Sequence, residues 1–228
     1  MYQLTIANKN YSSWSLRPWL LLRELGIPFD EKLAHFQAGS NWDAFRAFSP
    51  TGKVPCLLDG TQAIWDSLAI TEHLAERHPQ VWPAEPQARS WARCAAAEMH
   101  SGFFALRQHC TMNCGIRVQL HTLPEALQKD IARIDELWQE GLQRFGGPFL
   151  AGKSFSAVDA FFAPVAFRVQ TYGLQLSAPA AAYAQRLLAL PAVQSWYADA
   201  LQETAREPGH EEEARLAGTW LQDYRKQA

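Results

Sequence analysis

The stretch "PQVWPAEPQA", residues 79–88, divides the chain into two parts with different sequence patterns. Before it, short segments of alternating apolar residues take turns with segments of helical spacing. After it, the spacing is helical almost to the end. The three prolines of this stretch are typical of a linker, because proline fixes φ and removes a backbone donor. We therefore predict two domains, residues 1–80 and residues 87–228.

The first domain is predicted to alternate strands and helices. Tyr2, Leu4 and Ile6 recur with period two, which indicates a strand. Asp59-Gly60 joins two apolar runs and is a strong hairpin signal. The predicted elements are strands at 2–6 and 29–36, a hairpin at 54–65, and helices at 13–25, 40–48 and 67–78. This order, β-α-β-α-β-β-α, is that of a small α/β domain with a mixed sheet.

The second domain is predicted to be all-helical. Ser156 with Asp159 three residues later forms a capping box ahead of an apolar segment, which indicates the start of a buried helix. The charged run "HEEEAR", residues 210–215, is expected to be a solvent-exposed face. The predicted helices cover residues 87–115, 124–145, 157–172, 179–189 and 191–205.

The composition argues against several classes of protein. The chain has 228 residues, 48% of them hydrophobic, and a formal net charge of −2, so no basic excess suggests a nucleic-acid partner. Its apolar runs are far shorter than the roughly 20 residues that a membrane span needs. The start, "MYQLTIANKN", does not have the pattern of a signal peptide. We expect a cytoplasmic protein without a membrane partner.

The four cysteines, Cys56, Cys94, Cys110 and Cys114, show no disulfide framework and no C-x-x-C pair. Cys110 and Cys114 are four residues apart and have two histidines nearby, His109 and His121, so a metal site is one alternative. No second pair of ligands completes it. Reduced, packed thiols and no metal are the prediction.

Four local motifs, in order along the chain, resemble those of the soluble glutathione transferases. "YSSWSLR" at 11–17 is similar to the serine-bearing segment of the serine-type classes, above all the zeta class. "GKVPCLLDG" at 52–60 resembles the family's Val-Pro loop, and "WDSLAITEHL" at 65–74 resembles the entry to its third helix. "FSAVDAFFAPV" at 155–165 resembles the capping motif of its second domain. The resemblance implies a thioredoxin-like N-terminal domain, an all-α C-terminal domain and glutathione as ligand.

The resemblance also implies a set of glutathione-binding residues. Val54 would bind the cysteinyl unit of the peptide through its main chain, and Pro55 would be cis, although most X-Pro bonds are trans. Ser67 at a helix N-terminus suits a carboxylate, and Asp66 beside it suits the ammonium group. Asp66 has a plain alternative role as the N-cap of that helix. Lys53 could approach the glycine carboxylate or could simply be solvated.

The adjacent residues Ser12 and Ser13 are the catalytic candidates, with Ser13 preferred. No His–carboxylate pair is identifiable in the sequence as a base, so a serine hydroxyl is expected to donate a hydrogen bond to the glutathione sulfur. Lowering a thiol pKa by two units needs about 2.7 kcal/mol. A charge-assisted hydrogen bond of roughly 1.5–3 kcal/mol with a helix dipole of roughly 0.3–1 kcal/mol suffices. Both serines could instead be helix caps. Ser15 is expected to be a plain helix residue, and Arg17 a structural one.

The pocket for the second substrate is predicted on the long helix 87–115. His100, Phe103, Phe104 and Arg107 follow i, i+3, i+4, i+7 spacing and would share one face of it. Arg107 could then meet an anionic electrophile. The alternative is a packing face at the seam between the domains.

These observations predict a glutathione transferase that activates glutathione as thiolate for conjugation or isomerisation of a small electrophile. Family precedent implies a homodimer. A non-catalytic protein with this fold, a maleylacetoacetate-type isomerase and a peroxidase or dehalogenase are the alternatives. Trp14 stands where the zeta class has cysteine, which argues against the isomerase and against exchange chemistry by a thiol of the protein.

Overall fold

Strand β1 (Tyr2–Ile6) lies inside a four-stranded mixed sheet because Tyr2, Leu4 and Ile6 alternate toward the core. The computed structural model describes residues 1–37 and 39–227. The strand order is β2-β1-β3-β4, with β1 parallel to β2 and antiparallel to β3. The other strands are β2 (Phe29–Leu33), β3 (Cys56–Asp59) and β4 (Gln62–Trp65).

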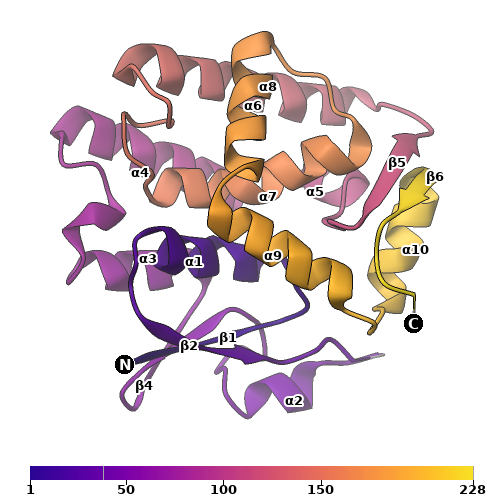
Figure 1. Cartoon of the computed structure of the whole chain (residues 1–228), viewed down its shortest axis with the longest axis horizontal. Helices are drawn as coiled ribbons and strands as arrows, with labels where there is room; N and C mark the ends of the chain where they lie inside the picture. The colour runs from indigo at the N-terminus through magenta and orange to yellow at the C-terminus, as the bar shows by residue number, and fades with distance from the viewer. Residues whose placement is uncertain (38, 228) are drawn as a thin grey trace.

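The helices of the first domain are α1 (Ser13–Glu24), α2 (Trp42–Arg46) and α3 (Ser67–Ala75). Figure 1 shows α1 and α3 between the sheet and the helical domain, with α2 on the opposite side of the sheet. The predicted order β-α-β-α-β-β-α is therefore confirmed. Because α1 begins directly at the domain seam, its first residues can take part in a site formed by both domains.

The second domain follows the short 3-10 helix η1 (Pro79–Val81) and is built mainly from helices. They are α4 (Pro86–Ser101), α5 (Phe104–His109), α6 (Glu125–Phe145), α7 (Ala157–Tyr172), α8 (Ala178–Leu188), α9 (Pro191–Gln202) and α10 (Pro208–Ala217). Helix α7 is buried along nearly its whole length and packs against α1, α4 and α8. The thioredoxin-like domain followed by a helical domain is thus as predicted.

Helix α7 begins at the predicted capping box, and Asp159 is its central acceptor. The buried Asp159 carboxylate accepts hydrogen bonds from the N–H groups of Leu150 at 3.1 Å and Ser156 at 2.9 Å. The hydroxyl of Tyr183 on α8 donates to it at 2.7 Å. Burial raises the pKa of Asp159 to about 6, against the effect of these hydrogen bonds. One carboxylate therefore joins the start of α7 to the preceding loop and to α8.

The predicted single helix at 87–115 is wrong, because the chain breaks at Gly102 and Phe103. Phe103 has φ of 56°, in the left-handed region, which ends the hydrogen-bonding pattern of α4. A Cβ at position 102 would lie 2.9 Å from the carbonyl oxygen of Glu98, so the close approach there requires glycine. After α5, residues 110–115 are not helical.

A two-stranded antiparallel ribbon accompanies the helices of the second domain and was not predicted. Strand β5 (Ile116–Leu120) pairs with β6 (Gly218–Asp223). Ile116 and Val118 on β5 are buried, and β5 packs against α7. Figure 1 shows the ribbon and α10 together at one end of the molecule, next to the domain seam. The C-terminal residues therefore fold back onto the middle of the chain.

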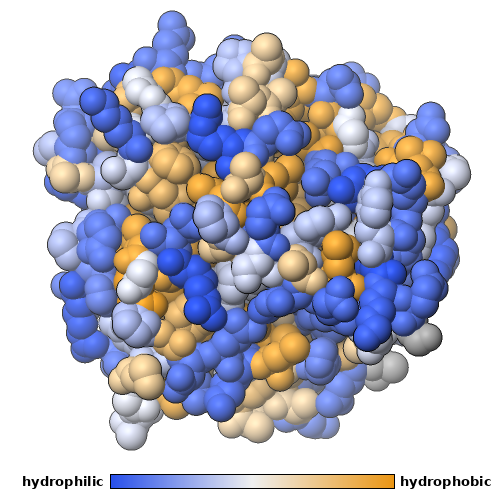
Figure 2. Space-filling model, in the orientation of Figure 1, coloured by the Kyte–Doolittle hydropathy of each residue, from blue (hydrophilic) through white to orange (hydrophobic). Residues whose placement is uncertain are grey.

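The surface of the molecule is mostly polar, as expected when most apolar residues are packed in the core. Figure 2 shows a face that is mostly hydrophilic, with apolar side chains in separate patches. Within the described residues no helix is both long and apolar enough to cross a membrane.

Cys56, Cys110 and Cys114 are buried free thiols and Cys94 is an exposed one. The described residues contain no group of three or more potential metal ligands.

Candidate functional site

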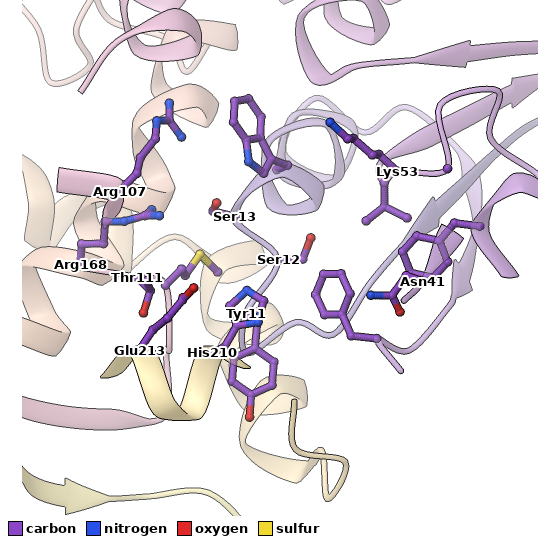
Figure 3. Close-up of a pocket in the computed structure, with 16 residues that line it drawn as sticks. Tyr11, Ser12, Ser13, Asn41, Lys53, Arg107, Thr111, Arg168, His210 and Glu213 are labelled. Atoms are coloured by element: carbon purple, nitrogen blue, oxygen red, sulfur yellow. The ribbon is translucent and has the colours of Figure 1, made fainter. Parts of the chain in front are cut away.

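A cavity of about 380 Å³ lies between the two domains. Figure 3 shows its side chains converging from the start of α1, the loops before α2 and β3, and helices α5, α7 and α10. The lining residues are Tyr11, Ser12, Ser13, Trp14, Phe36, Asn41, Phe45, Gly52, Lys53, Val54, Arg107, Thr111, Met112, Arg168, His210 and Glu213. Both predicted catalytic serines and two predicted glutathione-binding residues are among them.

The two serines differ in what their hydroxyl groups contact. The Ser12 hydroxyl donates to the Ser15 hydroxyl at 2.7 Å, and Ser15 in turn accepts from the N–H of Ala7 at 3.2 Å. Ser15 is thus not a plain helix residue but links α1 to the end of β1. Within the described residues, Ser12 makes no side-chain cap and the Ser13 hydroxyl has no hydrogen-bond partner. Ser13, the first residue of α1, therefore has a hydroxyl available to a ligand.

The loop before β3 forms the opposite wall of the cavity. Lys53 is exposed and lines it together with Val54. The Val54-Pro55 bond is cis, as the resemblance implied. Pro55 is buried behind the wall and does not line the cavity.

Asp66 and Ser67 lie at the start of α3 but do not line the cavity. Asp66 has φ of 72° and caps the helix by accepting from the N–H of Leu68 at 2.8 Å. Its other oxygen lies 3.5 Å from Nε2 of His100. The buried Ser67 hydroxyl accepts from Arg17 at 3.4 Å. The expected N-cap role of Asp66 is confirmed, and the role of the pair in glutathione binding stays a prediction.

The four residues predicted to share one helical face do not share it. The break at Gly102 puts His100 on α4 and the rest on or before α5. Phe103 is buried, whereas Phe104 is 73% exposed. Of the four, only Arg107 lines the cavity. The expectation of an aromatic pocket on one continuous helix was wrong because it assumed helical geometry across a left-handed residue.

Positive charge gathers on the helical-domain side of the cavity. Arg107 and Arg168 both line it, and neither has a carboxylate oxygen within 4 Å among the described residues. Burial, together with the charge of Arg168, lowers the pKa of Arg107 to about 10. Arg168 is anchored by donating to the carbonyl of Cys110 at 2.7 Å. Sequence reasoning missed Arg168, because only the packing of α7 against residues 110–114 brings it to the cavity.

Arg17 lies next to this group, deep between the domains. Its guanidinium is stacked on the rings of Trp14 at 4.2 Å and Phe161 at 4.8 Å. Among the described residues, Nε and one terminal nitrogen have no hydrogen-bond partner. Burial lowers its pKa well below the ordinary value, and the charges of Arg107 and Arg168 lower it further. The seam is thus strongly electropositive beside the serines.

The C-terminal segment forms the remaining wall and is held by a buried polar network. Glu211 accepts from the hydroxyl of Tyr11 at 2.7 Å and from Asn113 at 3.2 Å. Arg225 donates to the same carboxylate at 3.1 Å. The expectation that residues 210–215 form a solvent-exposed face was therefore wrong for Glu211, which is 6% exposed. Its partners are too far away in the sequence for any local pattern to predict the contact.

A histidine paired with a carboxylate also lies in this wall. Nδ1 of His210 is 2.6 Å from Oε2 of Glu207, and the His210 ring lies against Phe36 and Tyr11. His210 lines the same cavity as Ser12 and Ser13 (Figure 3). This pair could not be predicted from the sequence, because nothing in "EPGHEE" at 207–212 indicates that it faces the serine segment.

Comparison with known families agrees with this geometry. The chain matches the family model for the glutathione S-transferase N-terminal domain over residues 11–77 and the one for the C-terminal domain over residues 119–199. The chain belongs to the glutathione S-transferase family.

Its similarity to individual proteins is distant. Glutathione S-transferase GstB of Escherichia coli K12 is 32% identical over 111 residues, covering 43% of this chain and 53% of that protein. A stringent starvation protein A homolog of Pasteurella multocida is 24% identical, covering 69% of this chain and 71% of the relative. The theta class transferase of Xanthomonas axonopodis pv. citri, solved with glutathione bound, superposes with a TM-score of 0.60 at 22% identity, over 86% of this chain and 96% of the other.

The buried Glu211 network predicts a pH-dependent C-terminal wall. Burial works to raise the pKa of Glu211, but hydrogen bonds from Arg225 and Tyr11 outweigh it and hold the pKa below its ordinary value of 4.5. A carboxylate with a depressed pKa stabilises the fold above its unfolded pKa and loses that contribution as pH falls through the folded pKa. We expect that α10 and β6 lose protection from hydrogen exchange as the pH is lowered from about 4.5.

Hydrogen exchange by mass spectrometry, corrected for the intrinsic rate at each pH, measures this loss. Glu211→Gln should lower protection at neutral pH and remove the pH dependence. Glu212→Gln, a neighbouring exposed carboxylate, is the matched control and should keep both. An unchanged pH response in Glu211→Gln would contradict the assignment.

Proposed function

We propose that this chain is a cytoplasmic glutathione transferase that activates glutathione as thiolate and directs it to a small electrophile, in conjugation or isomerisation. Membership of the family supports the ligand. The observation that carries the proposal is the free Ser13 hydroxyl at the N-terminus of α1, inside the cavity between the domains. A helix N-terminus favours negative charge, and a hydroxyl without another partner can donate to a thiolate sulfur at no cost to the protein's own hydrogen bonds.

The remaining walls suit the rest of the tripeptide. Val54 offers main-chain groups at the cavity edge, and exposed Lys53 offers a charge to a carboxylate. Asp66 and Ser67 do not line the cavity, but they lie at the start of α3, where backbone N–H groups favour an anion. Glutathione would pair with the main chain of Val54, and each of its charged ends would meet one of these charged or polar groups. The thiol in the middle of the peptide would then lie over the start of α1.

Substitution of the serines tests the proposal. Ser13→Ala removes the hydroxyl that would hold the thiolate, so we expect the pKa of bound glutathione to rise and kcat/KM to fall about tenfold to a hundredfold. Ser12→Ala is the matched comparison and should cost less, because that hydroxyl is engaged by Ser15. Thiolate absorbance against pH and turnover of a chromogenic electrophile measure the two effects. The opposite ranking of the two variants would assign the thiol contact to Ser12.

A non-catalytic binding protein of the same fold is the second candidate, because one similar protein carries the name stringent starvation protein A homolog and not that of a transferase. Calorimetric titration of glutathione into the wild-type protein separates the candidates. Binding with a thiol pKa well below about 8.5 supports the transferase. Binding without a shift supports a binding role, and absence of binding contradicts the transferase and supports a non-catalytic protein that uses the fold for another interaction.

We infer that the electrophile is anionic. Arg107 and Arg168 line the cavity and have no carboxylate partner among the described residues, and a buried guanidinium is stabilised by an anion. This charge would also suit a maleylacetoacetate-type substrate. His100, Phe103 and Phe104 have no part in this proposal, since they do not line the cavity.

Arg107→Met tests the charge preference. We expect KM for a carboxylate-bearing electrophile to rise about tenfold, and KM for a neutral analogue to change much less. Arg107 also donates to the carbonyls of Gly102 at 3.1 Å and Met99, so its loss should lower the melting temperature. The ratio of the KM for the carboxylate-bearing electrophile to the KM for the neutral analogue does not depend on this loss of stability. If the variant has the same ratio as the wild type, Arg107 does not bind the anionic electrophile.

We also propose that the chain forms a homodimer through the β4 edge of the sheet. Strand β4 has a neighbour on one side only, and Trp65 on it is 43% exposed. Leu58 is 36% exposed on the adjacent strand β3. Burial of such side chains against a second copy would remove apolar area from water.

Trp65→Glu should therefore shift the mass measured by light scattering from that of a dimer toward 25.7 kDa. A charge placed in an apolar interface costs desolvation energy without a partner. Leu123→Glu, at another exposed apolar residue, is the control and should leave the mass unchanged. A wild-type protein that is monomeric, or a Trp65→Glu protein that stays dimeric, would contradict this interface.

A further inference from the structure

The Glu207–His210 pair has the geometry of an oriented base. Nδ1 of His210 lies 2.6 Å from Oε2 of Glu207, and the same oxygen accepts the backbone N–H of His210 at 2.7 Å. Burial works to raise the pKa of Glu207, but these hydrogen bonds outweigh it and hold the pKa below its ordinary value. The charged carboxylate therefore assigns the proton to Nδ1 of the neutral ring, and Nε2 is left as an acceptor.

The ring of His210 is held in place by packing as well. It stacks on Phe36 with ring centroids 5.4 Å apart and lies against Tyr11 at 5.1 Å. Tyr11 is itself fixed, because its hydroxyl donates to buried Glu211. The His210 side chain is 30% exposed, and that exposed part faces the cavity (Figure 3). Glu207 is also the N-cap of α10, so the carboxylate that caps the helix is the one that contacts the His210 ring.

We propose that His210, oriented by Glu207, is the general base that takes the proton from the glutathione thiol. The S–H bond breaks, the proton moves to Nε2, and the electron pair stays on sulfur as the thiolate held by Ser13. His210 then gives the proton to the leaving group or to solvent, so the step consumes no other reactant. This inference rests on the proposed function. It adds a proton acceptor to a mechanism in which a serine alone would stabilise the thiolate.

Charged groups of both signs surround His210. Glu207 contacts its ring, and Glu213 on the same helix lines the cavity. Glu211 is paired with Arg225. Arg107, Arg168 and Lys53 also line the cavity and supply positive charge that would stabilise a thiolate.

His210→Gln is the first test, because glutamine keeps a polar side chain of similar reach without a base. We expect kcat/KM with a neutral electrophile to fall about a hundredfold near pH 7. The loss should shrink toward pH 9, because above about pH 8.5 free thiol ionises without help. Glutathione affinity by calorimetry should stay within threefold of the wild type. Added imidazole should restore part of the rate.

Glu207→Gln and a matched control complete the design. Glu207 is a positioning residue, so its loss should lower kcat with the same pH pattern but to a smaller extent. His73→Gln breaks another His–carboxylate pair, 3.0 Å from Asp59 and outside the cavity, and should change neither rate nor pH profile.

The possible results separate this inference from the proposed function. If the wild-type protein does not bind glutathione, the proposed function fails and the base falls with it. If the wild type binds and turns over, but His210→Gln keeps full activity, only the base is overturned. A loss of rate that is equal at all pH values, with unchanged affinity and no imidazole rescue, would likewise overturn it and make His210 a structural residue.

Discussion

The buried ammonium group of Lys9 determines how the two domains meet. It lies 2.7 Å from Glu31 on β2 and 2.7 Å from Asp199 on α9, and stands over the rings of Trp19 and Trp196. A charge taken out of water is tolerated only when it is paired, so both domains must bring their carboxylates to this point. The loop between β1 and α1 is thereby fixed on the second domain, and the serines that follow it are fixed as well.

The backbone of the same loop is held by the C-terminal domain. The N–H groups of Lys9 and Asn10 donate to Glu203 at 2.7 and 3.1 Å. The side chain of Asn10 donates to Asn113 at 2.8 Å and accepts from the N–H of Gly115 at 2.9 Å. These contacts account for the non-helical backbone at 113–115, at the end of the helix predicted over 87–115. The N–H of Gly115 is paired with the Asn10 side chain, a hundred residues away, and not with a helical carbonyl.

The first domain could be predicted from sequence because its signals are local. Alternation in β1 and the turn at Asp59-Gly60 each depend on residues a few positions apart, and so does the one capping box predicted in the second domain, at Ser156. The serine segment and the Val54 loop were found by resemblance, and both reach the cavity. What could not be predicted depends on distant partners. Glu211 looks like a surface residue until its partners are placed beside it: Tyr11 is 200 residues away in the sequence and Arg225 is 14 residues away.

Charged groups of both signs line the cavity that holds Ser12 and Ser13. Among the described residues, Arg107 and Arg168 of the helical domain have no carboxylate partner, whereas His210 is paired with Glu207. Positive charge without a partner favours negative charge nearby. It would help to ionise a thiol and would draw an anionic partner to the cavity. One electrostatic arrangement therefore serves both activation of the thiol and choice of the electrophile, and it depends on the C-terminal segment staying folded against Tyr11.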